Sequence, residues 1–195
     1  MEPVFQWFWG FRVADGRANR WLYSCVDYNF VPKVAPFPSI PYALAEGLVL
    51  GAISAMYESQ FGGITMQAAM LTFGVLLMML FAYKTRLIKV TKKFRLGVIC
   101  ATGAIFLAYL ATFVMQFFGM GDILYLHSSG PIGILISVGI VVVAALNLVL
   151  DFDFIEKGAR HNSPKHMEWY GAFSLMVTLV WLYLEILRLI SKLRR

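Results

Sequence analysis

Acidic side chains stand within or at the ends of long apolar segments, where they are rare. They are Glu46, Asp151, Asp153 and Glu185. An ionised carboxylate at mid-membrane depth costs about 2.5–3.5 kcal/mol even on a lenient insertion scale, so it needs a partner, a proton, a cation or a path for water. Asn147 lies one helical turn before Asp151 and is expected on the same side of a helix. These residue types suit the handling of protons or cations.

Each carboxylate also has an ordinary structural explanation. Glu185 stands three residues before Arg188, so the two could form an ion pair on one helix face. Asp151 and Asp153 could be solvated at the membrane surface, where basic residues follow them. Glu46 could stay protonated and hydrogen-bond a neighbouring helix. The residues alone leave these alternatives open.

Patterns typical of enzymes are weak in this chain. Residues 119–122 (GMGD) have the GxGD pattern of intramembrane aspartyl proteases, but they lie in an expected loop and precede Asp151, so depth and order are both wrong. His161 and His166 lack the further ligands that a metal site needs, and a solvated loop explains them. The sequence shows no nucleophile elbow, phosphate-binding loop or zinc-protease motif. We therefore expect that the protein is not an enzyme.

The composition predicts a helical membrane protein. Hydrophobic residues make up 59% and charged residues 14% of the 195 residues, against about 45–50% and about 25% in average soluble proteins. Five apolar stretches of nearly spanning length predict an all-α, polytopic membrane bundle. The net charge of +6 does not indicate a nucleic-acid partner, because the basic residues lie between or beyond the apolar stretches.

The chain divides into a leader and a membrane domain. Residues 1–40 are expected to form an irregular or interfacial leader, because prolines are dense in its second part and its first residues are rich in Trp and Phe. Residues 41–195 are expected to form the transmembrane helical domain. The expected spans are about 41–57, 66–83, 96–118, 131–150 and 167–187.

The basic residues predict the orientation of the chain. The loop 84–95 holds six of the seventeen Lys and Arg residues, the leader four and the loop 151–168 three, whereas the intervening loops hold none. The positive-inside rule therefore places the loop 84–95 in the cytoplasm. The remaining four basic residues form the C-terminal tail. That tail lies outside if the fifth segment crosses fully, as its length favours, and inside if the segment is re-entrant.

Several stretches carry a family resemblance. They are AALNLVLDFDFIEKG (144–158), LYLEILRLISKL (182–193), YALAEGLVLGAIS (42–54) and the basic loop 84–95. Together they resemble the Bax inhibitor-1 family, the transmembrane Bax-inhibitor-motif proteins, and the ending MEWY…LVWLYLEILRL is similar to its bacterial branch. Members of that family usually have seven spans. The resemblance therefore implies an N-terminally shortened member, whose five spans match the last five.

The resemblance also implies a function. Family members act as pH-sensitive calcium leak proteins, in which two acids from the last two helices share a proton and hold a pore closed. Asp151 matches the first acid, and Glu185 stands where the family has a second Asp. We expect Glu46, Asp153 and Asn147 to support this pair, which is also a candidate Ca²⁺ site if water or carbonyl oxygens complete the shell. Spacing alone does not bring the pair together, since simple spans place Asp151 near the inner membrane surface and Glu185 near the outer one.

The expected partners are membrane lipid, calcium or other cations, and other membrane proteins. The expected location is a bacterial plasma membrane, and no cofactor other than Ca²⁺ is expected. A second hypothesis is a protein without transport activity that binds other membrane proteins and modulates a stress response or membrane protein quality control. Its contact surfaces would be the loop 84–95 and the C-terminal tail. Calcium flux in vesicles distinguishes the two hypotheses.

Overall fold

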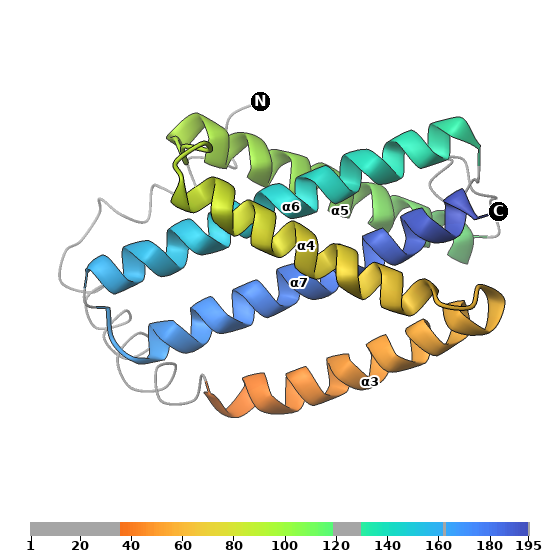
Figure 1. Ribbon diagram of the computed structural model, residues 1–195, viewed down its shortest axis with the longest axis horizontal. Helices are drawn as coiled ribbons and strands as arrows, with labels where there is room; N and C mark the ends of the chain where they lie inside the picture. The colour runs from red at the N-terminus through yellow and green to blue at the C-terminus, as the bar shows by residue number, and fades with distance from the viewer. Residues whose placement is uncertain (1–35, 119–129, 162, 195) are drawn as a thin grey trace.

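The structure, a computed structural model, describes residues 36–118, 130–161 and 163–194. Within these ranges the chain forms five helices and no strand (Figure 1). The helices are α3 (Pro36–Gln60), α4 (Ile64–Lys84), α5 (Lys92–Phe117), α6 (Pro131–Arg160) and α7 (His166–Leu193). The predicted all-helical bundle is confirmed. Most of the expected leader 1–40 lies outside the described residues.

Four of these helices, α4 to α7, are long and apolar enough to cross a membrane. The first expected span, 41–57, lies within α3, which is not among these four. Large apolar side chains point outward along the helices, as Leu77 on α4 and Phe106 on α5 do. An outer surface of this kind suits contact with lipid chains rather than with water.

The described helices are longer than the predicted spans, and α6 and α3 exceed them most. The fourth span was expected to end at 150, but α6 continues to Arg160. Asp153 stands just after the expected end of the span. Lys157, one turn later on the same helix, donates to its carboxylate at 2.6 Å. Because the acid is paired within the helix, α6 continues past it. Likewise, α3 begins at Pro36, within the expected irregular leader. Proline is tolerated in a first helical turn, whose N–H groups have no intrahelical acceptor.

The centre of the bundle is the antiparallel pair α6 and α7, which lie side by side (Figure 1). Leu148 and Leu182 are fully buried between the helices. Gly171 allows a close approach, because a Cβ atom there would lie 2.9 Å from Cγ1 of Ile155. Helix α4 packs on both members of the pair, and α3 packs on α7 and α4. Small residues at an interface let two helices approach closely in a membrane. Helices α6 and α7 stay in contact along their length and form the centre of the bundle.

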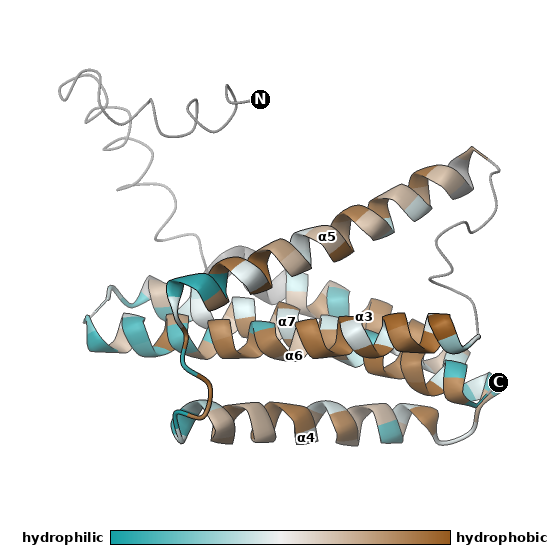
Figure 2. Ribbon diagram, turned by 90° about the horizontal axis from the view of Figure 1, so that it is seen from above, coloured by the Kyte–Doolittle hydropathy of each residue, from teal (hydrophilic) through white to brown (hydrophobic). Residues whose placement is uncertain are grey.

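Helix α5 is the least attached of the described helices. Among the described helices, its backbone lies close only to that of α6. Figure 2 shows it running at an angle to the others, so that its C-terminal end stands away from α6 and α7.

The helix ends define two faces of the bundle. Tyr83, near the end of α4, donates a hydrogen bond to Glu156, near the end of α6. The basic loop 84–95 therefore shares a face with the α6–α7 connection. At the opposite face Arg194 donates to the carbonyl of Gly62 at 3.0 Å, beside the α3–α4 turn. Helix α7 runs from the first face to the second as one uninterrupted helix that is long and apolar enough to cross a membrane. Full crossing of the fifth segment stays a prediction.

The turn between α3 and α4 is capped by an acid. The carboxylate of Glu58 accepts hydrogen bonds from the backbone N–H groups of Gly63 and, at 3.0 Å, of Thr65. Gly63 has a φ of 78°, a left-handed conformation that suits glycine. The N–H groups at a helix start favour a negative charge. These bonds lower the pKa of Glu58 below its usual range.

Replacing Glu58 by Gln is expected to lower the melting temperature at neutral pH, because α4 loses its charged cap. A carboxyl whose pKa is lowered on folding stabilises the protein above its unfolded pKa, and this stabilisation is lost as the pH falls through the folded value. The difference between variant and wild type should therefore shrink in acid. Thermal unfolding in detergent across this range measures it. A difference that stays constant with pH, or one equal to that of the exposed Glu168→Gln, contradicts the prediction.

Candidate functional site

Asp151 lies on the face of α6 that meets α7 and is 8% exposed. The hydroxyl of Ser174 on α7 donates to its Oδ1 at 2.5 Å. Its Oδ2 is buried and has no hydrogen-bond partner. A buried carboxylate oxygen without a partner is costly, so this atom is available to a proton or a cation. Of the predicted site residues, Asp151 alone is left with such an open oxygen in the described part of the chain.

Asp153 is neutralised by two cations. Its Oδ2 accepts from Lys157 on the same helix and, at 3.0 Å, from Arg95 on α5. The sequence suggested a basic neighbour on α6, and the structure adds a second from another helix. Asp153 therefore fastens the start of α5 to the end of α6.

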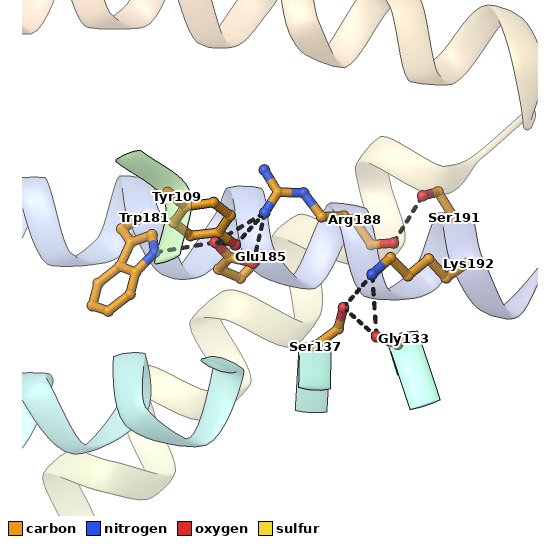
Figure 3. A network of polar contacts seen from close by, with 8 residues as sticks. All are labelled: Tyr109, Gly133, Ser137, Trp181, Glu185, Arg188, Ser191 and Lys192. Carbon is orange, nitrogen blue, oxygen red and sulfur yellow. Dashed lines mark hydrogen bonds and ion pairs between the residues drawn. The ribbon is translucent and has the colours of Figure 1, made fainter. Parts of the chain in front are cut away.

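Glu185 is the most deeply buried of the predicted acids, with 2% of its surface exposed. Its carboxylate accepts from Arg188 at 3.1 Å, from the hydroxyl of Tyr109 at 2.8 Å and from the indole of Trp181 at 3.1 Å (Figure 3). Arg188 also donates to Tyr109 and lies over its ring. The ion pair expected from spacing is confirmed. Tyr109 extends this pair from α7 to α5.

The structure does not bring Asp151 and Glu185 together. Ser174, the partner of Asp151, stands on the same helix as Glu185 but eleven positions before it. At 1.5 Å per residue the separation along α7 is about 16 Å. The expected proton-sharing contact, and a Ca²⁺ ion held between these two carboxylates, are therefore absent from this arrangement. The reason is that α7 crosses the bundle as one uninterrupted helix.

The two remaining predicted residues have separate roles. Asn147 donates to the hydroxyl of Thr102 on α5 at 2.7 Å and to the carbonyl of Val143 at 2.9 Å. It was expected on the same side as Asp151, but it turns to α5 whereas Asp151 turns to α7. Glu46 is half-buried on α3, where its carboxylate contacts Tyr42 one turn earlier.

Helix α5 is joined to the bundle by polar side chains at a regular spacing. Arg95 binds Asp153, Thr102 binds Asn147, and Tyr109 binds Glu185. Residues seven apart lie almost on one helix face, so these three form a polar seam along α5. The spacing is visible in the sequence, but Arg95 was assigned to the loop 84–95, and Thr102 and Tyr109 were not singled out.

A cavity opens beside the outer part of this seam. It has a volume of about 390 Å³ and lies between α5 and α7. Tyr109, Glu185 and Arg188 border it together with apolar side chains such as Phe106 and Leu184. In the described part of the chain, no group of three or more His, Cys, Asp or Glu side chains could hold a metal ion. The site thus offers single carboxylates and a polar seam rather than a metal cage.

A family model described as Bax inhibitor 1 like matches residues 24–195. The chain belongs to the Bax inhibitor 1-like family. The match confirms the resemblance found in the sequence and includes every acid discussed above. No curated protein and no solved structure matches the chain. Placement of this Bax inhibitor 1-like chain in the bacterial branch stays a prediction.

Replacing Arg188 by Gln is expected to lower the free energy of unfolding by about 3–5 kcal/mol, because Glu185 would keep a buried charge without its counter-ion. The double variant Glu185→Gln/Arg188→Gln should recover most of that loss, since neither charge remains. Unfolding in mixed micelles measures both. Arg160→Gln, which breaks the more exposed ion pair with Glu156, is the control and should change stability far less. Equal losses in the single and double variants would contradict this reading of the pair.

Proposed function

We propose that this Bax inhibitor 1-like membrane protein is a pH-sensitive cation leak protein with Ca²⁺ as a permeant ion. The observation that supports the proposal is the buried, unpartnered Oδ2 of Asp151. A carboxylate in an apolar helix bundle with one free oxygen either holds a proton or seeks a cation. The charge on Asp151 therefore depends on the pH and the cations around it.

Asp151 acts on α5 through its neighbour on α6. Asp153 lies two residues further along and binds Arg95, the first residue of the polar seam. A negative charge on Asp151 also attracts Arg95 and so weakens the ion pair between Arg95 and Asp153, whereas a protonated Asp151 does not. Interhelical hydrogen bonds in membranes contribute about 0.6 kcal/mol on average. The three contacts of α5 together hold this helix with roughly 2 kcal/mol. A change in the charge of Asp151 is therefore large enough to move it.

Movement of α5 opens a route for ions along the polar seam. Thr102, Asn147 and Asp153 offer hydroxyl, amide and carboxylate oxygens along this seam, which are the ligands that Ca²⁺ prefers. Because Ca²⁺ takes six to eight oxygen ligands, water must accompany the ion, and binding is too weak to trap it. Glu185 has its own counter-ion in Arg188 and accepts from Tyr109 of α5, so in this proposal it anchors α5.

The proposed location is a bacterial plasma membrane with the loop 84–95 in the cytoplasm. This orientation follows from the excess of basic residues in that loop. The polar contacts of Asp151 and Asp153 then lie toward the cytoplasmic end of the bundle, and the Glu185 cluster lies toward the outer end.

In vesicles loaded with a calcium dye, the purified protein is expected to conduct Ca²⁺ at a rate that changes with pH. Asp151→Asn mimics the protonated acid, so its flux at every pH should equal the low-pH flux of the wild type. Asp153→Asn releases Arg95, so it should raise the flux and remove most of its pH dependence, because Asp151 acts on α5 through this contact. Glu58→Gln, distant from the seam, is the matched acid control and should behave as the wild type. Absence of flux with every variant, together with capture of a specific membrane-protein partner, contradicts transport and supports the interaction hypothesis.

Fixing α5 against α6 is expected to stop the leak. We would place cysteines at Thr102 and Asn147, whose side chains are in contact, in a chain with Cys25→Ser and Cys100→Ser. Oxidation should join the two helices and abolish flux, and reduction should restore it. The single variant Thr102→Cys under the same oxidant is the control. Undiminished flux through the cross-linked protein, verified by peptide mapping, would show that α5 does not open the route.

A further inference from the structure

A second cavity lies at the face that carries the basic loop. Its volume is about 690 Å³, and it is enclosed by the end of α4, the α4–α5 connection and the end of α6. Lys84 and Arg160, which border it, are the last residues of α4 and α6. Both helices are long and apolar enough to cross a membrane. The cavity therefore sits where the membrane meets water.

The cavity has more cations than its acids can neutralise. It is bordered by Lys84, Arg86, Lys89 and Arg160, and by two acids of α6. One acid, Asp153, is bound to cations outside the cavity lining, and the other accepts from Tyr83 and Arg160. Lys84, Arg86 and Lys89 form no ion pair with any described residue. The free charge in the cavity is thus positive.

The backbone holds Arg86 in an unusual conformation. Its φ is 58°, and it is the one residue other than glycine with positive φ in the described chain. Its N–H donates to the carbonyl of Tyr83, and the next N–H to that of Ala82, which ends α4. Glycine usually occupies such a position because it has no Cβ. Backbone strain of this kind is concentrated at functional sites, which favours a binding role for the Arg86 guanidinium.

The other part of the cavity is apolar. Leu80, Ile88, Val90, Phe152 and Ile155 border the same space. An occupant that satisfies both parts carries an anionic group beside a hydrocarbon chain. At the boundary between membrane and water, an anionic phospholipid meets this description.

We propose that this cavity binds an anionic phospholipid, with its phosphate at Arg86 and Lys89 and an acyl chain along Leu80 and Ile88. Basic pockets between membrane helices suit such headgroups, and anionic lipids are concentrated in the cytoplasmic leaflet. The occupant is a lipid rather than a free anion, because a free anion would leave the apolar side chains of the cavity without an apolar partner. The site is independent of the proposed leak, since none of its contacts requires Ca²⁺ or Asp151.

The test is native mass spectrometry of the full chain in detergent, titrated with phosphatidylglycerol, phosphatidylcholine or inorganic phosphate. Phosphatidylglycerol should bind, and the double variant Arg86→Gln/Lys89→Gln should weaken it by roughly tenfold or more. Lys93→Gln/Lys165→Gln removes two exposed cations from the same face outside the cavity and should leave affinity unchanged. Arg86→Gly also relieves the backbone strain, so it should lose lipid while unfolding no earlier than the wild type.

Three results would overturn the proposal. Equal binding of phosphatidylcholine would make the cavity a general apolar groove. Competition by inorganic phosphate alone would make it a free-anion site. An equal loss of affinity in the Lys93 and Lys165 variant would show that overall charge, and not this cavity, retains the lipid. None of these outcomes depends on whether the protein conducts calcium, so the lipid site and the leak can fail separately.

Discussion

Lipid has no water to satisfy a polar group, and it gives two apolar helices no hydrophobic reason to associate. In the described part of this protein, polar contacts between helices both satisfy the polar groups and hold the helices together. The polar seam of α5 satisfies side chains of α6 and α7 and at the same time holds α5 in place. Helices α6 and α7 instead pack along their length through leucine and glycine. In the function proposed above, a change of charge on α6 therefore acts first on α5, the helix that depends on these polar contacts.

Much of the fold could be predicted from the sequence because a membrane span must be apolar over a fixed length. The positions of the helices follow from that requirement. The ends of the helices could not be predicted as well. An acidic residue indicates the end of an apolar span unless the cation that neutralises it is known. Asp153 marked such a boundary, yet Lys157 and Arg95 neutralise it and α6 continues. Only the first of these two partners is near it in the sequence.

The acids of the candidate site were found by type, since carboxylates are rare in apolar segments. Their local partners were also accessible, as the Glu185–Arg188 pair shows. Partners from other helices were not, because Ser174 and Tyr109 approach the acids only once the helices pack. The family resemblance suggested a contact between Asp151 and Glu185. An uninterrupted α7 separates them and leaves Asp151 with the open oxygen.

The basic end of α7 bears on how the bundle is assembled during synthesis. Lys192 is buried and donates to the carbonyl of Gly133 and the hydroxyl of Ser137, at the start of α6 (Figure 3). Arg194 reaches the α3–α4 turn. Both acceptors belong to segments that leave the ribosome earlier. Helix α7 can therefore exchange the hydration of its cations for these protein acceptors only after the start of α6 and the α3–α4 turn have been synthesised.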